Sequence, residues 1–283
     1  MKNFTILTGL YNSNIFLDSY FKTIFNQIIL PNEIILIDDG NNYNLDEIIY
    51  NKKKQYDFKN IILIKNINNI GLGPSLNLGL KITSNKLVFR LDADDLWLKN
   101  HTQKMLNSYS QNKNNVIYAE SLKYNNLRNI IKCDNFLINE NSTIHSSWLI
   151  NKNVCPDFRY HVTNPKIALE DYFTLFWYKY HGYEINISYQ QITTIYKDTP
   201  NSLGKKYANN VHYLKNRKKL SKFFFNHELK KRNLFAKLYL ILFEMNLIRI
   251  IVYLFWVQDI IKTKYFFTKL KSLKKTAFNY FSS

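Results

Sequence analysis

Short, uninterrupted apolar runs alternate with longer segments in which apolar residues recur at helical spacing, and this alternation limits the fold more than any other feature of the chain. The apolar runs lie at 4–8, 33–37, 61–64, 86–91 and 116–119, and segments of helical spacing lie at 14–27, 73–82 and 97–109. A strand that is apolar along its whole length is typical of a parallel sheet covered by helices on both faces. The pattern predicts an α/β fold with a Rossmann-like, mainly parallel sheet sandwiched by helices.

Two acidic clusters directly follow strands of this predicted sheet. Asp38 and Asp39 follow the second apolar run, and Asp92, Asp94 and Asp95 follow the fourth. Ligands of open α/β sheets bind beyond the carboxyl ends of the strands, and parallel strands bring those ends to one rim. We therefore expect the two clusters to lie close together.

Carboxylates that share a rim repel one another unless a cation lies among them. The Asp-x-Asp turn at 92–94 offers hard oxygen ligands for Mg²⁺ or Mn²⁺, and a metal held by few protein ligands keeps positions free for phosphate oxygens. The sequence thus predicts a metal–phosphate site. The alternative is that these aspartates are turn residues or helix N-caps, as Asp95 would be before the segment at 97–109.

The positive charge of the chain is concentrated in its last part. The formal net charge is +18; residues 205–283 hold 18 Lys and Arg against three acidic side chains, which leaves residues 1–204 with a net charge of +3. We expect a catalytic domain at 1–204 and a basic, aromatic-rich helical extension at 205–283 that binds an anionic membrane surface. Four charged residues interrupt the apolar stretch at 234–261, so it is not predicted to span the bilayer.

The alternative for that apolar stretch is a helical hairpin packed on the domain or on a second copy, which leaves homo-oligomer formation open. Basic and aromatic residues also suit single-stranded nucleic acid, but no nucleic-acid-binding module is recognisable, so nucleic acid is not an expected partner.

Two cysteines without a CxxC spacing favour a reducing compartment. The N-terminal residues are typical of a first strand rather than a signal peptide. The expected location is cytoplasmic, peripheral on the inner face of the cell membrane.

Five stretches occur in an order typical of one enzyme family. They are TILTGLYNSNIFLDSYFKTIFNQ, PNEIILIDDG, NIGLGPSLNLGLKITSNKLVFRLDADD, IHSSWLINK and ALEDYFTLFWYKYHGYEI. Together they make the chain similar to family 2 glycosyltransferases with a GT-A fold, of the bacterial type that builds surface polysaccharides. Each stretch alone is unspecific, and their order carries the resemblance.

The resemblance implies a binding site for a nucleotide-sugar donor, with UDP as the expected nucleotide. Asp38 and Asp39 would face the uracil and the ribose, near Tyr11. Asp92 would lie by the ribose or by a metal-bound water, and Arg90 would counter the acidic cluster.

The resemblance also assigns the metal to Asp94 together with Asp92, and the catalytic base to Asp171. Displacement of UDP from the anomeric carbon builds negative charge on the diphosphate, which Mn²⁺ or Mg²⁺ neutralises. A carboxylate on the opposite face of the sugar accepts the proton of the attacking hydroxyl group, which gives inversion. Asp171 follows Glu170 near the start of a predicted helix at 168–180, where the helix dipole favours the anionic form; the ordinary acidity of a helix start is the alternative.

Four further side chains are candidates for contacts to the acceptor or the diphosphate: Glu170, His145, Lys197 and Asp198. For His145 the alternative is a structural histidine. The segment Tyr-Arg-x-His-x-x-Ser, which closes the donor site in many family members, corresponds to YKDTPNS at 196–202, with threonine in place of the histidine. Either Asp198 supplies a metal-side or phosphate-side contact, or Lys197 contacts the diphosphate.

The sequence therefore predicts an inverting, metal-dependent glycosyltransferase that moves a sugar from a nucleotide-sugar to a glycan or lipid-linked acceptor. A nucleotidyltransferase that forms sugar nucleotides is the enzymatic alternative. It would need a basic, glycine-rich loop near the N-terminus, and TGLYNSN contains no Lys or Arg. A membrane-binding α/β module without enzymatic activity is the other alternative.

Overall fold

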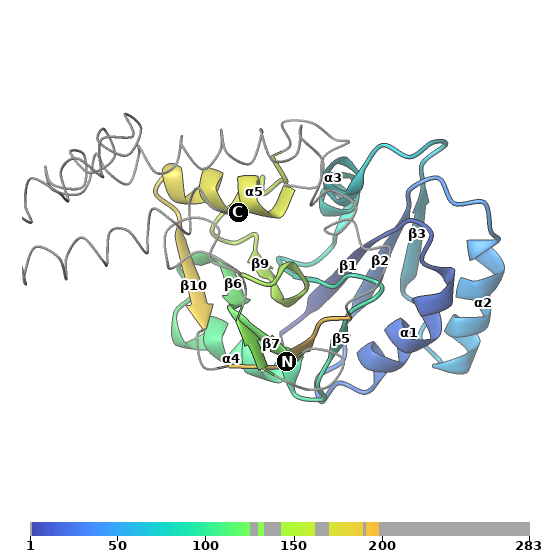
Figure 1. Ribbon diagram of the computed structural model, residues 1–283, viewed down its shortest axis with the longest axis horizontal. Coiled ribbons are helices and arrows are strands. Elements are labelled where there is room, and N and C mark those ends of the chain that lie inside the picture. Colours follow the sequence, from blue (N-terminus) through green and yellow to red (C-terminus); the bar gives the residue numbers. More distant parts are fainter. Residues whose placement is uncertain (1, 125–129, 133–142, 162–169, 189–190, 198–283) are drawn as a thin grey trace, which may run out of the picture. The chain divides into compact units, whose positions relative to one another are not determined.

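The computed structural model describes residues 2–124, 130–132, 143–161, 170–188 and 191–197 (Figure 1). The expected extension at 205–283 and its boundary at residue 204 lie outside these ranges, so both stay predictions. No helix within the described ranges is long and apolar enough to span a bilayer.

A seven-stranded sheet forms the centre of the described chain, in the order β10-β6-β9-β4-β1-β2-β3. Its strands are β1 (Phe4–Leu10), β2 (Glu33–Asp38), β3 (Ile61–Lys65), β4 (Leu87–Arg90), β6 (Asn115–Glu120), β9 (Leu149–Asn151) and β10 (Glu184–Ser188). β1 pairs with β2 and β4, β2 with β3, and β6 with β10, all in parallel, while β9 runs antiparallel between β4 and β6. The expectation of a mainly parallel sheet is confirmed, and β9 and β10 are additions that the apolar runs do not predict.

The two acidic clusters lie on the same rim of the sheet, as expected. Leu10 at the end of β1 pairs with Asp38 at the end of β2, and β4, on the other side of β1, ends at Arg90. The turns that follow these three strands therefore meet beyond their carboxyl ends. Gly40 turns the chain after β2 with a φ of 80°, and a Cβ atom there would lie 2.7 Å from the backbone nitrogen of Asn69. Only glycine allows this turn to pack so closely on the loop that follows β3.

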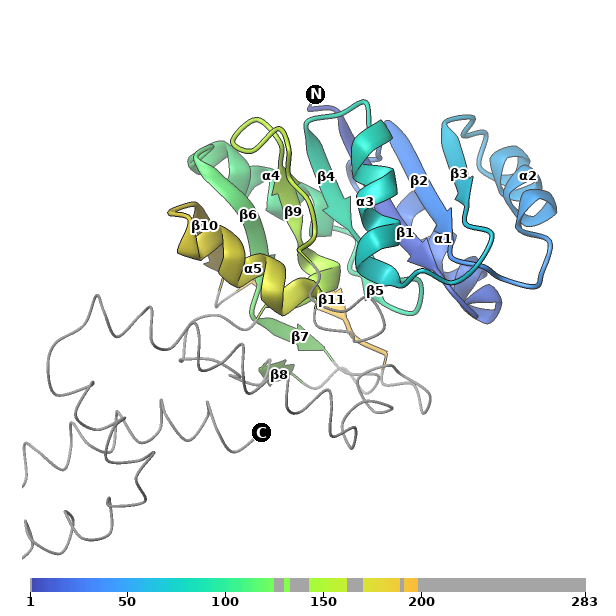
Figure 2. The ribbon, with the colours of Figure 1, turned by 90° about the horizontal axis from the view of Figure 1, so that it is seen from above.

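Helices cover both faces of the sheet (Figure 2). α1 (Leu17–Phe25), α2 (Leu45–Gln55) and α4 (His101–Gln111) lie on one face, and α3 (Leu72–Ile82) and α5 (Glu170–Tyr180) lie on the other. Successive residues of a strand point to opposite faces, so Ile34 of β2 packs toward α1 while Ile35 packs toward α3. α3 approaches the sheet closely at Gly79, where a Cβ atom would lie 2.3 Å from a side chain of β1. The predicted sandwich is confirmed.

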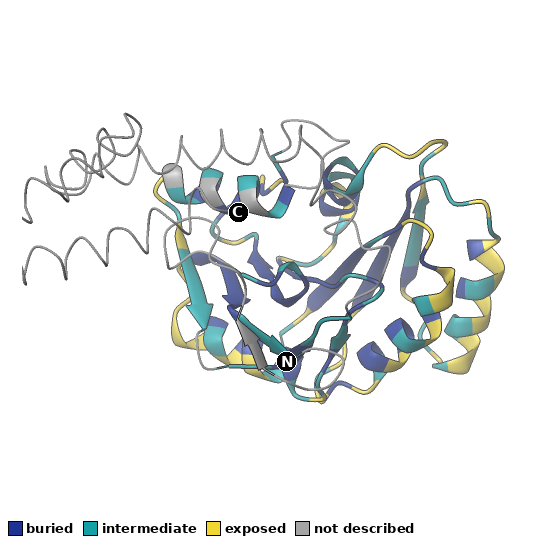
Figure 3. Ribbon diagram, viewed as in Figure 1, coloured by how far each residue is buried: buried dark blue, intermediate teal, exposed yellow. Residues whose placement is uncertain are grey.

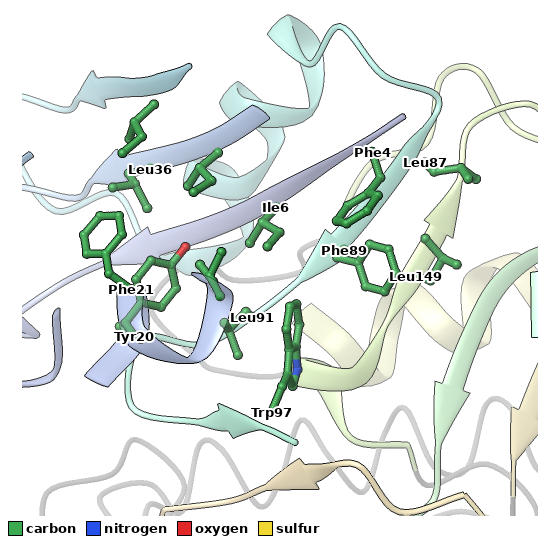
Figure 4. Packing of buried hydrophobic residues seen from close by; sticks show 14 of the residues in the cluster. Phe4, Ile6, Tyr20, Phe21, Leu36, Leu87, Phe89, Leu91, Trp97 and Leu149 are labelled. Atoms are coloured by element: carbon green, nitrogen blue, oxygen red, sulfur yellow. The ribbon is translucent and has the colours of Figure 1, made fainter. Parts of the chain in front are cut away.

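Buried residues lie along the strands and on the helices that cover them (Figure 3), and large apolar side chains pack between the sheet and the helices on both faces; Figure 4 shows those on the α1 face. On the α1 face, the ring of Phe89 lies 4.8 Å from that of Phe4 and 5.8 Å from that of Trp97. On the α5 face, Phe158 stacks on Tyr178 with ring centroids 4.6 Å apart. Because a buried aromatic side chain removes about 150–250 Å² from water, these rings contribute strongly to the stability of the sandwich.

Apolar spacing does not predict α2, because this helix buries only Leu45 and Ile49. Its ends are defined by polar residues instead. The Asn44 side chain accepts a hydrogen bond from the backbone nitrogen of Glu47 at the N-cap, and lysines at 52–54 occupy the last turn. Negative charge near the start and positive charge near the end interact favourably with the helix dipole and stabilise the helix.

A second, four-stranded sheet lies beside the main one, in the order β5-β11-β7-β8. Its strands are β5 (Leu96–Trp97), β7 (Leu122–Tyr124), β8 (Ile130–Lys132) and β11 (Thr194–Ile195). The expectation of a helix from residue 97 is wrong at its start, because Trp97 pairs with Thr194 and its backbone nitrogen donates to the Thr23 hydroxyl at 2.9 Å. α4 begins at His101 with Asn100 at its N-cap, so the reading of Asp95 as a helix cap is wrong.

Candidate active site

A buried ion pair lies at the end of β4. Arg90 has no exposed surface, and its guanidinium group donates hydrogen bonds to Asp92 Oδ1 and to the carbonyl oxygen of Leu91. Burial raises the pKa of Asp92, but the charge of Arg90 and the hydrogen bonds from Ser146 and Arg90 outweigh it, and the net pKa lies below its ordinary value. Arg90, which was expected to counter the acidic cluster, thus pairs directly with Asp92 and holds it in its anionic form.

Ser146 joins two carboxylates of the acidic turn. It belongs to the short 3-10 helix η2 (His145–Ser147), and its Oγ lies 2.9 Å from Asp92 Oδ2 and 2.5 Å from Asp95 Oδ2. The other oxygen of Asp95 accepts a hydrogen bond from the backbone nitrogen of Lys197 at 3.1 Å. Asp95 therefore links the turn after β4, η2 and the segment after β11. The sequence offers no signal for these contacts, because they join residues more than fifty positions apart.

Asp94 differs from its neighbours in the turn. It is half-buried, and within the described ranges no other side chain hydrogen-bonds to it. Burial, and then the charge of Asp92, raise the pKa of Asp94 to about 6. A cation beside this carboxyl group would favour the charged form. Of the two expected metal ligands, Asp94 is the more available, since both oxygens of Asp92 already accept hydrogen bonds.

The donor set of this turn fits Mg²⁺ or Mn²⁺. No group of three or more His, Cys, Asp or Glu side chains in the described part of the chain could hold a metal ion. Mg²⁺ is commonly held by one or two carboxylates, with water and substrate phosphates completing its coordination. Asp94, with Asp92 beside it, offers that kind of partial site.

Asp38 and Tyr11 lie at the ends of β2 and β1. The carboxylate of Asp38 is buried, and its Oδ1 accepts hydrogen bonds from the backbone nitrogen of Asn41 at 2.8 Å and from its side-chain amide at 2.7 Å. The Asn41 side chain also bonds to the carbonyl oxygen of Leu10. Asp38 therefore shapes the turn after β2, while the Tyr11 side chain, 52% exposed, is open to a ligand.

Asp39 organises the loop that follows β3. One carboxylate oxygen accepts hydrogen bonds from the Asn66 side chain at 2.8 Å and the Ile70 backbone nitrogen at 2.9 Å, and the other accepts from the Gly71 backbone nitrogen at 3.0 Å. These bonds fix the loop at the start of α3, against the turn at Gly40. The expected contacts of both aspartates to uracil and ribose stay predictions.

Glu170 and Asp171 occupy the first turn of α5, where the helix was expected to place them. Glu170 is buried, and burial, followed by the charge of Asp171, raises its pKa to about 8. The charges of Asp92 and Arg90 also act on Glu170. Glu170 is therefore within electrostatic reach of Asp92 and Arg90 at the end of β4.

His145 is half-buried beside the same cluster. Its Nε2 lies 2.8 Å from the hydroxyl oxygen of Tyr160. Burial, followed by the charge of Arg90, lowers the pKa of His145 to about 3, so its imidazole ring is neutral. Tyr160 is a site residue that the sequence does not single out, since nothing in its local pattern distinguishes it from the other tyrosines of the chain.

Lys197 lies beside the acidic turn. Its backbone is tied to Asp95, its Nζ lies 3.3 Å from the Ser19 hydroxyl, and its charge lowers the pKa of Asp94 against the larger effect of burial. This position suits the expected contact to a diphosphate. Asp198, the alternative, lies outside the described residues.

Comparison with known proteins identifies the family. Residues 5–167 match the family described as "Glycosyl transferase family 2". A relative from Escherichia coli, "UDP-Gal:alpha-D-GlcNAc-diphosphoundecaprenol beta-1,3-galactosyltransferase", is 31% identical over 112 residues, which are 38% of this chain and 40% of that protein. The chain thus aligns with less than half the length of this relative.

Solved structures share the fold. The structure of TarS residues 1–349 from Staphylococcus aureus in complex with UDP superposes with a TM-score of 0.58 at 15% identity, covering 81% of this chain and 72% of that one. The mannosyltransferase PcManGT from Pyrobaculum calidifontis, in complex with GDP-Man and Mn²⁺, also gives 0.58, at 10% identity and with 82% and 65% coverage. These likenesses show the GT-A fold. The match over residues 5–167, which is more than half of the chain, establishes that the chain belongs to glycosyl transferase family 2.

Proposed function

We propose that this chain is an inverting, metal-dependent glycosyltransferase that transfers a sugar from a UDP-linked donor to a glycan or lipid-linked acceptor in the synthesis of a cell-surface polysaccharide. One observation carries the proposal. The charges of the Arg90–Asp92 pair, which lies at the end of β4 beside the open carboxylate of Asp94, act on Glu170 of the acid pair that begins α5. A metal–diphosphate site and a carboxylate base are the two components that such a transfer requires.

The donor would bind along the rim after β1, β2 and β4. Tyr11, Asp38 and Asp39 would line the nucleoside side, and Lys197 would contact the diphosphate. Asp94 and Asp92 would hold Mn²⁺ or Mg²⁺, which when bound supplies positive charge against the leaving diphosphate. The names of the relatives support this donor class, since the Escherichia coli enzyme is named for UDP-Gal and TarS was solved with UDP.

Asp171 would accept the proton of the acceptor hydroxyl group. Glu170 is buried and its pKa is raised to about 8, so it is largely protonated at neutral pH and can donate a hydrogen bond to the acceptor. The Escherichia coli relative is named for a lipid-linked, diphosphoundecaprenol acceptor. An acceptor of this kind suits a peripheral enzyme on the inner membrane face, held there by the basic extension at 205–283.

The test begins with donor binding. Isothermal titration of the full chain with UDP, in Mn²⁺ and in EDTA, should show that Mn²⁺ tightens UDP binding by at least about tenfold. Asp94→Asn should remove this gain. Asp57→Asn is the matched control: Asp57 is exposed after α2, and its φ of 46° suits asparagine as well as aspartate. If the chain binds UDP in neither buffer, the proposal is refuted.

The second step tests transfer. A panel of UDP-sugars and GDP-sugars, offered with diphosphoundecaprenol-linked GlcNAc and with free oligosaccharides, should give metal-dependent transfer from a UDP-sugar with inversion at the anomeric carbon. Retention of the anomeric configuration would refute the assignment of Asp171 as a base. Transfer from GDP-sugars alone would refute the assignment of the nucleotide.

A further inference from the structure

We propose that Tyr160 is a positioning residue for sugar transfer, whose hydroxyl group fixes the ring orientation and the tautomer of His145 beside Asp92. This inference rests on the proposed function, because it concerns the same site. His145 itself is a candidate contact to the acceptor or the diphosphate, and Tyr160 would act only through it.

The structure holds the Tyr160 backbone from two sides. The backbone nitrogen of Tyr160 donates to Asn77 Oδ1 at 2.7 Å, and Asn77 Nδ2 donates to the carbonyl oxygen of Tyr160 at 2.9 Å. Asn77 lies on α3, so one side chain fastens this otherwise irregular segment to a helix that packs on the sheet. Its amide group saturates both backbone groups of a single residue. These two hydrogen bonds fix the position of the Tyr160 backbone, from which its side chain extends.

The ring of Tyr160 is held as firmly as its backbone. Its plane lies 3° from that of Trp148, with ring centroids 6.1 Å apart, and Phe158 meets it edge-on at 6.0 Å. Both Tyr160 and Trp148 are almost fully buried. With backbone and ring fixed, the hydroxyl group has one accessible position, which is 2.8 Å from His145 Nε2.

Among the described residues, the Tyr160 hydroxyl group is the hydrogen-bond partner that can define the tautomer of His145. A neutral imidazole carries its proton on either nitrogen, and the hydrogen bond at one nitrogen decides what the other offers. A phenol that donates to Nε2 leaves a proton on Nδ1, so the imidazole presents a donor to a substrate oxygen. Loss of the hydroxyl group removes that constraint and lets both tautomers exchange.

The location of the pair links it to the reaction rather than to packing alone. His145 precedes Ser146, whose hydroxyl group bridges Asp92 and Asp95. Burial raises the pKa of Tyr160, and the charges of Arg90, Asp92 and the acid pair at 170–171 also act on its hydroxyl group. The phenol therefore lies between the end of β4 and the start of α5, which carry the donor-side and acceptor-side chemistry.

Nitrogen NMR tests the link directly. The chain contains six histidines, so ¹⁵N-histidine labelling gives few imidazole signals, and His145→Gln assigns the relevant one. Tyr160→Phe keeps the stacked ring and both bonds to Asn77, and it should shift the Nδ1 and Nε2 resonances of His145 toward a mixture of tautomers. Tyr178→Phe is the matched control, because Tyr178 is equally buried and its hydroxyl oxygen accepts from the Arg159 backbone nitrogen at 2.9 Å. Unchanged His145 resonances in Tyr160→Phe would overturn the proposal.

Kinetics test whether the link matters for transfer. Tyr160→Phe should lower kcat by about tenfold to a hundredfold with little change in the donor KM, as expected for lost orientation. In the His145→Gln background the same substitution should have little further effect, whereas Tyr178→Phe should change kcat equally in both backgrounds. An undiminished effect of Tyr160→Phe without His145 would refute positioning. A wild-type chain that transfers no sugar would overturn the proposed function, and the nitrogen spectra distinguish that failure from a failure of the Tyr160–His145 link.

Discussion

Asp92→Asn should destabilise the fold more than Arg90→Met, although both substitutions remove the same ion pair. The Arg90 side chain is 0% exposed and the Asp92 side chain is 29% exposed. After Asp92→Asn the guanidinium group stays buried without a carboxylate. After Arg90→Met the carboxylate of Asp92 keeps the Ser146 hydroxyl group, 2.9 Å away, and part of its hydration. The asymmetry follows from how far the remaining charge can be solvated.

The burial of the two partners sets the expected magnitudes. Two unit charges about 4 Å apart interact by about 4 kcal/mol at an effective dielectric constant of about 20. Removing one partner of a fully buried pair costs about 3–5 kcal/mol, and we expect a loss of that size for Asp92→Asn. For Arg90→Met we expect about 1–2 kcal/mol, because the methionine needs no counter-charge and Asp92 remains hydrogen-bonded. The double variant should be more stable than Asp92→Asn alone.

Urea unfolding followed by circular dichroism measures these free energies. The solutions contain EDTA and no nucleotide, so that bound ligands do not add to the stability. Lys65→Met and Asp46→Asn provide the control, because they break an ion pair whose side chains are 49% and 63% exposed. Each should change the free energy of unfolding by less than about 1 kcal/mol. A cost for Arg90→Met that equals or exceeds the cost of Asp92→Asn would refute the reasoning.

Three further predictions concern the base, the pH dependence and the extension. Asp171→Asn should bind UDP with wild-type affinity in titration calorimetry but lower kcat by about 10²–10⁴-fold, and a wild-type kcat would show that the base lies elsewhere. Burial lowers the pKa of His101 from 6.5 to about 3, so the unfolded chain takes up a proton that the folded chain does not as the pH falls below 6.5. Between pH 7.5 and pH 5 this proton uptake should lower the free energy of unfolding by about 2 kcal/mol. His101→Phe should abolish this loss, so the two proteins should differ in their pH dependence. A parallel pH dependence of both would contradict the prediction. Replacement of Lys230, Lys231 and Arg232 by glutamine should weaken binding to anionic vesicles by about 3 kcal/mol and leave binding to neutral vesicles unchanged; equal binding of variant and wild type to both would argue against membrane attachment through this cluster.

The sequence predicts the sheet and the position of the acidic clusters because both depend on local patterns. The run at 33–37 is apolar throughout since β2 is buried on both faces, and Asp38 follows because ligand-side turns begin where the strand ends. The helix that starts at Glu170 can be predicted in the same way, because the apolar spacing and the acidic residues of the first turn both indicate a helix there. Each of these features can be predicted from fewer than fifteen consecutive residues.

The contacts that complete the site could not be predicted in this way. Nothing in the local sequence distinguishes Ser146, Tyr160 or Asn77. Each takes its role from a hydrogen-bond partner in a distant segment. The start of α4 shows the same limit. Trp97 has helical spacing with the residues after it, but the hydrogen bond from its backbone nitrogen to the Thr23 hydroxyl group and its pairing with β11 keep it extended.

The contacts at the rim also explain how metal binding and donor binding would be coupled. Asp39, Asp92 and Asp95 are already hydrogen-bonded within the protein, which fixes the turns before any substrate arrives. Asp94 alone among the acids of its turn keeps its carboxylate open within the described residues, with a pKa raised to about 6 by burial and by Asp92. Burial and the charges of Asp92 and Asp94 also raise the pKa of Asp95, so two carboxyl groups share the unfavourable energy of this crowding, and of these two Asp94 is the one open to a cation. A cation that relieves it, and that brings phosphate oxygens with it, would gain more from this rim than either ligand would gain alone.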